Sequence, residues 1–300
     1  MKLGNNDISS FKLGSNDVNK IYLGSTQLDL GGSFLLDGLT GSTGGFSLRK
    51  LSSSYVGSAI QVRRDSDDAT QNIGFVNNEL DTTSLNSFCS GANGFISIWY
   101  NQSDTNNNMI QTTSSNQPKI YDSSNGVFIN NGKPSIQFEN SMYFESTNTT
   151  FLNLSDVKSN FGVFKTNVQA TQIIMSKGHY SNSQWFSYFT NISKIENAYD
   201  GFLSFGSSPN RHNQNLIYSN INNTGTDGLK TYVNNSLEFQ NTTTKDLIGT
   251  NTYKVNFGRS SRYNTWYLQG NIQELVFFSS DQTSNKIAIE TNLNSYYSVY

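Results

Sequence analysis

Short strand signals recur roughly every 10 to 15 residues through the second half of the chain, with no long helical pattern between them. The signals are rich in aromatic and β-branched residues, and Asn, Ser, Thr and Gly fill the segments that separate them. They begin at Phe161, Gln172, Trp185, Gly201, Leu216, Leu229, Tyr253 and Gly270. Evenly spaced short strands with polar turns are typical of sandwiches, so this rhythm predicts an all-β fold of jelly-roll type.

Three short segments have helical spacing instead. Ile287 and Leu293 share one face of a C-terminal segment that starts with a capping residue at Thr283, which predicts a helix that closes the domain. Residues 80–89 and residues 46–51 also predict short helices. The expected architecture is therefore a β-sandwich with short helices and one C-terminal helix.

The stretch 55–103 has the most specific choice of residues in the chain. Ile60 and Val62 alternate with polar neighbours near its start, and Phe95 and Trp99 do so near its end. Alternation of this kind indicates half-buried strands, joined here by a polar crossover.

Composition narrows the classes of function. The chain has 300 residues, which fits one large all-β domain or two ordinary ones, and 13% of them are aromatic, enough for a substantial core. A net charge of −2 argues against a general nucleic-acid binder. One cysteine and two histidines exclude an internal disulfide and a Cys/His metal site, so we expect no metal and no cofactor.

The sequence has no apolar stretch of the kind that targets or spans a membrane. Its first residues lack the apolar core of a secretory signal, and no apolar run approaches the ~18 residues of a membrane span. We therefore expect folding in a cytosol and no membrane insertion.

The first thirty residues repeat with a period of ten. Leu3, Leu13 and Leu23 each precede a glycine and polar turn residues, and Phe11 and Ile21 lie two residues before the second and third leucines. Each repeat predicts a short strand, a turn and an apolar return. Such a unit cannot bury its own apolar face, so these five residues are assembly candidates, packed on the main domain or on another chain. We favour assembly.

Glycines divide the chain into segments. Residues 32–45 are glycine-rich and predict a linker, which places the repeats in a docking or oligomerisation segment over residues 1–31. The main sandwich domain is then expected over residues 46–300.

Several signatures of the main domain resemble a known family in order and spacing. They are Tyr55-x-Gly-x-Ala-Ile-x-Val-Arg-Arg-x-Ser-Asp, Ile73-Gly-Phe, Leu80-Asp, Gly94-Phe and Trp99-Tyr-Asn-Gln-Ser. Together they resemble the catalytic module of arabinofuranosidase B-type glycosidases, and Gly270-Asn-Ile-Gln-Glu-Leu looks like part of its sandwich. The resemblance implies a concanavalin A-like or laminin G-like jelly roll.

Hydrolysis of a glycosidic bond needs two carboxylates. The resemblance implies where each of them should lie in this sequence. The family places its acid/base Asp directly after a glycine near the C-terminus, where this chain has Gly258 followed by Arg259. Glu196, followed by Asn197, is the nearest candidate for the nucleophile. Since no carboxylate occupies the acid/base position, this departure predicts a domain that has lost hydrolysis and is not an enzyme.

Other polar and aromatic residues suggest binding sites. Trp185, Arg259, Arg262, Tyr263 and Trp266 are the glycan-binding candidates, because aromatic rings stack on sugars and guanidinium groups grip carboxylates. Each aromatic could equally fill the core.

Two clusters and the histidines have a plainer interpretation. Arg63 and Arg64, beside three aspartates, could bind an acidic sugar or simply form structural ion pairs. The loop 104–108 is a weak calcium candidate. His179 and His212 are expected at the surface.

Two functions from different classes remain. Sequences of this kind also occur in bacteriophage virion proteins, and the N-terminal repeats resemble the leader of phage tail and structural proteins. We therefore predict a virion structural protein, of the tail, a fibre or a decoration, made in the host cytoplasm and located in the virion. Its expected partners are other virion proteins, copies of itself with a trimer favoured, and a host-surface glycan bound through avidity. The alternative is a glycosidase or depolymerase of surface polysaccharide.

Overall fold

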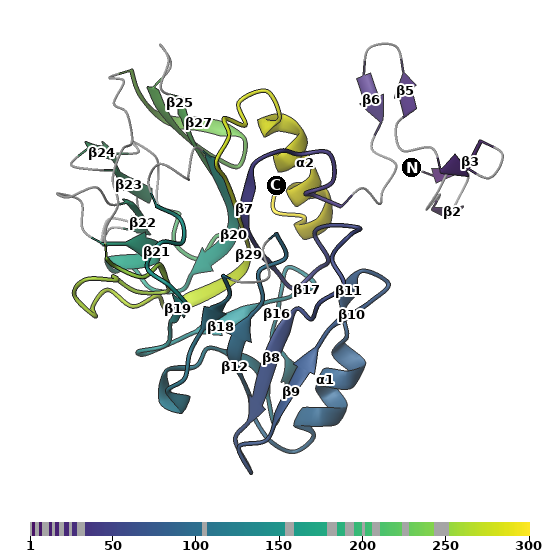
Figure 1. Cartoon of the computed structure of the whole chain (residues 1–300), viewed down its shortest axis with the longest axis vertical. Helices are drawn as coiled ribbons and strands as arrows, with labels where there is room; N and C mark the ends of the chain where they lie inside the picture. Colours follow the sequence, from purple (N-terminus) through teal and green to yellow (C-terminus); the bar gives the residue numbers. More distant parts are fainter. Residues whose placement is uncertain are drawn as a thin grey trace.

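In the computed structural model, the described residues are 34–103, 107–153, 159–178, 211–223, 228–242 and 252–300, with the backbones of short strands in the intervals 1–33 and 179–210. The fold is a β-sandwich of antiparallel strands, which confirms the predicted all-β jelly-roll class (Figure 1). A helix near the C-terminus, α2 (Lys286–Tyr297), and a short helix, α1 (Thr82–Cys89), lie outside the sheets.

The first sheet is built around the longest strand, β29 (Gly270–Phe278). One edge of β29 pairs with β20, and its other edge pairs with β7 along one half and with β18 along the other. The remaining strands extend the sheet in both directions. In order they are β27 (Ser236–Asn241), β26 (Gly228–Val233), β25 (Leu216–Asn223), β20 (Ser159–Thr166), β29, then β7 (Ser42–Ser47) and β18 (Ile136–Phe138), β14 (Lys119–Asp122) and β15 (Gly126–Val127).

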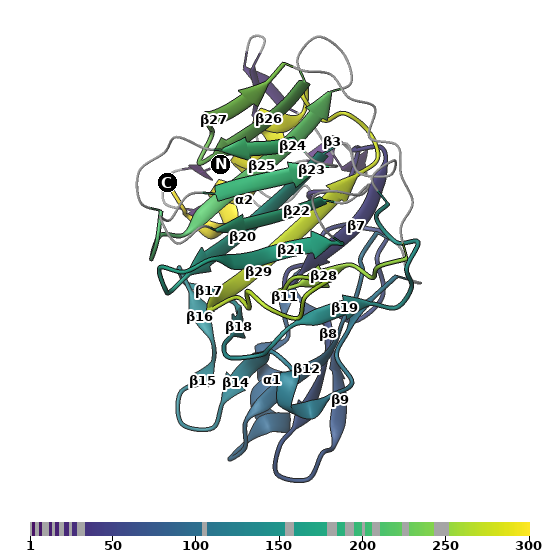
Figure 2. The same ribbon diagram turned by 90° about the vertical axis from the view of Figure 1, so that its left-hand side faces the viewer.

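The second sheet packs against the first. Its strands are β24 (Phe202–Phe205), β23 (Ile195–Tyr199), β22 (Trp185–Phe189), β21 (Gln172–Lys177), β28 (Asn256–Phe257), β19 (Phe144–Ser146) and β13 (Met109–Ile110). Figure 2 shows β21 to β24 side by side on one face of the molecule.

Strand β12 (Gly94–Trp99) joins the two sheets. On one edge it pairs with β8 (Ile60–Arg64), which continues to β9 (Thr70–Ile73). On the other edge its start pairs with β14 of the first sheet and its end with β13 of the second. The stretch 55–103 therefore contains the strand that connects the two sheets of the sandwich.

Short hairpins and one turn of 3₁₀-helix complete the fold. They are β1 (Lys2–Leu3) with β2 (Asn6–Asp7), β3 (Lys12–Leu13) with β4 (Asn16–Asp17), β5 (Ile21–Leu23) with β6 (Thr26–Leu28), β10 (Phe75–Val76) with β11 (Glu79–Leu80), β16 (Ile129–Asn130) with β17 (Lys133–Pro134), and the 3₁₀ turn Ser114–Asn116. Each N-terminal decapeptide thus forms a hairpin, as its repeat predicts. The side chains of Leu3, Phe11, Leu13, Ile21 and Leu23 lie outside the described residues, so their role in assembly stays a prediction.

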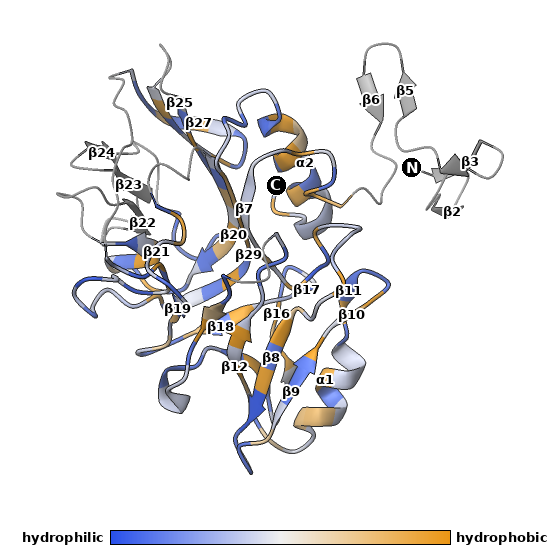
Figure 3. Ribbon diagram, in the orientation of Figure 1, coloured by the Kyte–Doolittle hydropathy of each residue, from blue (hydrophilic) through white to orange (hydrophobic). Residues whose placement is uncertain are grey.

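Aromatic side chains fill the space between the sheets. Trp99 is fully buried and packs edge-on against Phe46 and Phe257, with ring centroids 5.8 and 6.2 Å apart. Phe257 of the second sheet also stacks on Phe277 of the first at 5.9 Å. Figure 3 shows apolar residues along β8, β12 and β18, which line this core. Since burial of a large apolar side chain contributes about 1.5–3 kcal/mol, the cluster is a major source of stability.

Helix α2 covers the outer face of the first sheet. Ile289, Leu293 and Tyr297 pack there in a second apolar cluster with Val276 and Phe278 of β29. The predicted helix is confirmed, but Ile287, expected on its buried face, is 69% exposed, because the face that packs on the sheet is formed by Ile289, Leu293 and Tyr297.

The sequence is misleading at residues 46–51, where the predicted helix is wrong. Phe46 and Ser47 end strand β7 and pair with Leu275 and Glu274 of β29. The leucine spacing in this segment resembles one helical face, but pairing with a central strand prevails over that local pattern. Strand β7 also includes residues 42–45 of the predicted linker, while the domain boundary itself stays a prediction.

Helix α1 and the two strands of the 55–103 stretch are confirmed. Asp81 caps α1, since its carboxylate accepts from the backbone N–H of Ser84 at 2.9 Å. In β12 the predicted alternation breaks at a register shift between Ile96 and Ile98, and the buried large side chains of the strand are those of Ile96 and Trp99.

Candidate functional site

The predicted acid/base position lies at the end of β28, where the chain leaves the second sheet. Gly258 has a φ of +89°, and a Cβ added there would lie 2.7 Å from the Phe138 ring. Only glycine fits this backbone and this space. Arg259 follows directly, so its position is fixed by the close packing of the residue before it.

Arg259 lies in a cluster of charged and aromatic side chains. Its Nε donates to Asn256 Oδ1 at 2.6 Å, and its guanidinium lies 3.4 Å from the centre of the Tyr143 ring. Its Nη2 is 3.6 Å from Glu145 Oε2, while Lys254 Nζ lies 2.5 Å from Glu145 Oε1. The position that lacks a carboxylate in sequence therefore has one beside it, contributed by β19.

Sequence reasoning missed Glu145. It lies between Phe144 and Ser146, both buried, and so points away from the core, as alternation in a strand requires. That alternation is the only local signal. Its pairing partner in β28 is Asn256, more than a hundred residues away, and this contact cannot be read from either segment alone.

The chain after Arg259 forms a loop that is hydrogen-bonded to β21. Ser176 Oγ donates to the backbone carbonyl of Arg259 at 2.8 Å and accepts from the N–H of Ser261 at 2.9 Å. The N–H of Gly178 donates to Ser261 Oγ. These contacts fix the base of the loop on the second sheet.

Two of the predicted glycan-binding residues lie together at the tip of this loop. The rings of Tyr263 and Trp266 are 6.4 Å apart between centroids and are 46% and 44% exposed. Arg262 is exposed and lies 5.0 Å from the centre of the Tyr263 ring. The structure therefore brings Arg262, Tyr263 and Trp266 together, with Arg259 at the foot of the same loop.

The predicted nucleophile is placed by its backbone. In β23, Glu196 pairs with Tyr188 of β22 and with Phe205 of β24, so its backbone lies in the strand next to the β24 end of the second sheet. The side chains of Glu196 and of the predicted glycan contact Trp185 lie outside the described residues.

The arginines of the 55–103 stretch form structural contacts. Arg63 pairs with Asp68 at 2.8 Å and donates to Gln117. Arg64 pairs with Asp67 at 2.6 Å, and the hydrogen bond from Arg64 lowers the pKa of that carboxyl. Their donors are occupied by partners within the domain, which agrees with the plainer of the two interpretations.

The two histidines and the calcium candidate loop are the remaining candidates. His212 is half-buried, while His179 and residues 104–106 of the calcium candidate loop lie outside the described residues. Within the described part of the chain, no group of three or more His, Cys, Asp or Glu side chains is placed to hold a metal ion. No helix among those residues is long and apolar enough to cross a membrane.

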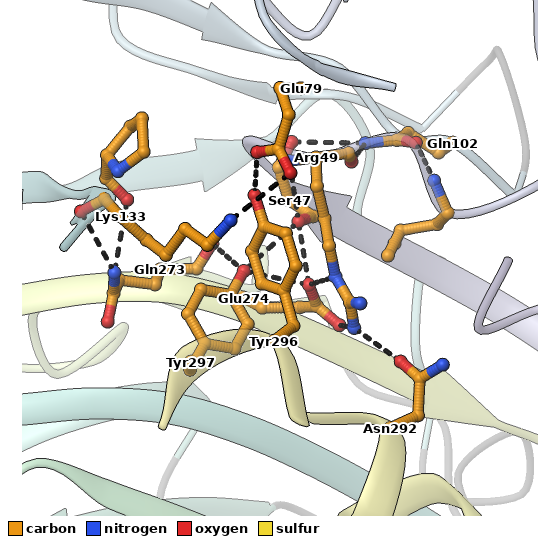
Figure 4. A network of polar contacts seen from close by, with 12 residues as sticks. Ser47, Arg49, Glu79, Gln102, Lys133, Gln273, Glu274, Asn292, Tyr296 and Tyr297 are labelled. Atoms are coloured by element: carbon orange, nitrogen blue, oxygen red, sulfur yellow. Dashed lines mark hydrogen bonds and ion pairs between the residues drawn. The ribbon is translucent and has the colours of Figure 1, made fainter. Parts of the chain in front are cut away.

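A buried polar network, which the sequence did not indicate, lies beneath α2 on the outer face of the first sheet (Figure 4). Glu274 of β29 is fully buried and accepts from Arg49, Ser47 and Tyr297. Because Arg49 neutralises the carboxylate and the helix covers it, this cluster is suited to holding α2 on the sheet rather than to binding a substrate.

Comparison with known proteins connects the fold to one family. A family model described as alpha-L-arabinofuranosidase B, catalytic, matches residues 38–202. No curated protein matches the chain.

Solved structures share the fold at low sequence identity. A mutant of a GH54 α-L-arabinofuranosidase, soaked with 4-nitrophenyl α-L-arabinofuranoside, is 16% identical with a TM-score of 0.63, over 84% of this chain and 62% of that one. An arabinofuranosidase complexed with arabinofuranosyl-α-1,2-xylobiose is 16% identical with a TM-score of 0.57, over 87% and 64%. The chain thus spans less than two thirds of the length of these proteins.

The family match overturns the prediction of a non-enzymatic virion structural protein, and with it the predicted virion location, because the matching model describes a catalytic domain. That prediction gave the N-terminal repeats and the Arg259 position more weight than the signatures of residues 55–103. Those signatures lie inside the matched range, whereas Arg259 and the whole of the repeat segment 1–31 lie outside it. The alternative, a glycosidase, agrees better with the match.

Proposed function

The chain belongs to the family of α-L-arabinofuranosidase B catalytic domains, and from this premise we propose that it is a glycoside hydrolase that cleaves α-L-arabinofuranosides. The observation that carries the proposal is the family match over residues 38–202, which includes Glu196. The arabinofuranosides named with the solved structures supply two test substrates. One is 4-nitrophenyl α-L-arabinofuranoside, and the other is arabinofuranosyl-α-1,2-xylobiose.

We assign the nucleophile to Glu196. In a retaining glycosidase, one carboxylate attacks the anomeric carbon while the bond from that carbon to the leaving oxygen breaks. Water then attacks the glycosyl ester, which releases the sugar and restores the carboxylate. Glu196 suits this role because it lies within the matched range and in a strand that is paired on both sides rather than in a loop.

The acid step is where this chain departs from the family. A general acid protonates the leaving oxygen and contributes roughly 10²–10⁴-fold to the rate. Arg259 replaces it here and cannot release a proton under ordinary conditions. Nitrophenolate is a weak base and can leave without being protonated. The oxygen of a sugar leaving group is a much stronger base and needs a proton from a general acid. We therefore expect the aryl glycoside to be the better substrate by a wide margin.

The test is hydrolysis of 4-nitrophenyl α-L-arabinofuranoside by the full chain, followed by release of nitrophenolate. We expect Glu196→Gln to lower kcat/KM by about a thousandfold or more, because it removes the nucleophile and keeps the shape. Glu79→Gln is the matched control, since Glu79 lies in the network beneath α2 and is expected to leave the rate unchanged. A folded wild-type chain without activity would overturn the proposal, and an active Glu196→Gln variant would overturn the assignment of Glu196.

A further inference from the structure

We propose that Tyr263 and Trp266 form a stacking subsite for the neutral sugar chain that carries the arabinofuranosyl group. The subsite deepens the proposed function and rests on it, because it would hold the part of the substrate that remains after cleavage. The subsite predicts that the chain binds an arabinofuranosyl group more tightly when that group is attached to an oligosaccharide or polysaccharide than when it is part of a small aryl glycoside.

The backbone of Trp266 is strained, and burial does not account for the strain. Its φ is +56°, a left-handed conformation that bulky L residues rarely adopt, while 44% of the residue is exposed. A core residue would gain packing in return for such a conformation, but Trp266 presents its ring to solvent. Strain of this kind persists where the surrounding structure fixes it, and it is concentrated at functional sites.

Hydrogen bonds around the loop hold this conformation. The carbonyl of Trp266 accepts from the N–H of Ile173 in β21 at 2.9 Å, and the carbonyl of Thr265 accepts from Ser260 at 3.1 Å. The N–H of Leu268 donates to Gly258 at 2.9 Å. The backbone is therefore fixed on both sides of the tryptophan. A pre-positioned ring loses less conformational entropy when it binds a ligand than a mobile one does.

Register places the aromatic pair in line with the proposed nucleophile. Trp266 bonds to Ile173, Ile173 pairs with Tyr188, and Tyr188 pairs with Glu196. These four residues form one row across the second sheet, in three inter-strand steps. At 4.7–4.9 Å a step, the row spans about 14 Å. The backbones of Glu196 and Trp266 are therefore close enough for a substrate of several sugar units to reach from one to the other.

The chemistry of the pair suits a neutral sugar chain. Aromatic rings offer an apolar face to the C–H groups of a sugar, and both rings are partly exposed to solvent. The rings lie nearly edge to face, at 69°, so they present two surfaces rather than one flat patch. Arg262 stacks on Tyr263 and Asn264 is exposed beside it, which adds hydrogen-bond donors without a carboxylate that would repel or select charged sugars.

The experiment measures binding and hydrolysis separately, in the full chain. Isothermal titration calorimetry with arabinofuranosyl-α-1,2-xylobiose gives the affinity of wild type, Trp266→Ala, Tyr263→Ala and the control Tyr300→Ala. Tyr300 is an equally exposed tyrosine, at 51%, beyond the end of α2. We expect Trp266→Ala to weaken binding about tenfold or more, which corresponds to about 1.4 kcal/mol. Tyr263→Ala should weaken it less, and Tyr300→Ala should match wild type.

A second variant and a second substrate separate the outcomes. Trp266→Gly suits the positive φ and also removes the ring, so it should weaken binding as Trp266→Ala does even if the alanine variant folds poorly. For hydrolysis, the loss of kcat/KM should be about tenfold greater for the trisaccharide than for the aryl glycoside. Folded Trp266 variants that bind the trisaccharide as wild type does would overturn the subsite.

The two proposals can fail independently. Trp266-dependent binding without any hydrolysis would support the subsite and refute the glycosidase. Hydrolysis of the aryl glycoside with no effect of Trp266 on the trisaccharide would support the glycosidase and refute the subsite. Binding of an unrelated protein through the pair, with no affinity for the sugar, would also refute the subsite.

Discussion

Arg49 donates to both carboxylate oxygens of Glu274, from Nε at 2.8 Å and from Nη2 at 3.0 Å, in a position closed off from solvent by α2. Burial by itself would lower the pKa of Arg49, but the charge of Glu274 and the hydrogen bond to it raise that pKa well above its usual range. The pair connects the end of β7 with the middle of β29 and lies under the rings of Tyr296 and Tyr297. Each hydrogen bond of this network comes from a single side chain, so each can be removed by one substitution.

We expect Glu274→Gln to lower the free energy of unfolding by about 3–5 kcal/mol, because it leaves the Arg49 charge buried without a counter-charge. Urea unfolding followed by circular dichroism measures this. Tyr297→Phe is the graded control, since it removes one hydrogen bond to Glu274, at 2.9 Å, and keeps the ring; the expected loss is about 1.5–3 kcal/mol. Equal losses in the two variants would mean that charge plays little part.

Restoring a carboxylate at the family's acid/base position tests whether the missing general acid limits the hydrolysis of bonds between two sugars. We expect Arg259→Asp to raise kcat/KM for arabinofuranosyl-α-1,2-xylobiose by up to about a hundredfold, with little gain on the aryl glycoside. The new carboxyl would lie near Glu145, and repulsion between like charges raises the pKa of one of two neighbouring carboxyls, which favours a proton donor.

Arg259→Asn is the matched control for that experiment. It removes the same arginine and keeps the shape of the aspartate side chain, but it adds no carboxyl group that could donate a proton. A comparable gain in both variants would point to the loss of the arginine rather than to a restored acid. No gain in Arg259→Asp would show that the proton donor lies elsewhere.

Much of the fold could be predicted because strands and helices leave local patterns. Apolar alternation located β8, and short runs rich in aromatic and β-branched residues located β20 and β29. The segment 46–51 was misread because its strand is specified by pairing with β29, more than 200 residues away.

The site was less accessible to sequence reasoning for the same physical reason. Tyr263 and Trp266 could be chosen by residue type, but their exposure and the row that connects them with Glu196 depend on strand register. The proximity of Glu145 to Arg259 depends on the pairing of β19 with β28. Contacts between distant strands set these relationships, and no local pattern encodes them.

The strain at Trp266 can be measured with a pair of variants that differ only in the backbone they allow. Trp266→Ala and Trp266→Gly both remove the ring, but only glycine adopts a positive φ without a steric penalty. We expect the glycine variant to be more stable by about 1 kcal/mol, since the left-handed conformation costs an L residue about 1–2 kcal/mol. Thermal unfolding compares them. Equal stability would show that position 266 carries no strain.

Cys89 provides a test of the packing between α1 and the sandwich. Burial raises the pKa of its thiol from 9.0 to about 11, and the nearby Arg64 only partly offsets this. The thiolate is the reactive form, so at pH 8 it should be about a hundredfold scarcer in the folded chain than in the unfolded one. We expect iodoacetamide to label Cys89 slowly in native buffer and rapidly in urea, with native labelling accelerating up to about pH 11. Rapid labelling of the folded chain at pH 8 would contradict the buried position of this thiol.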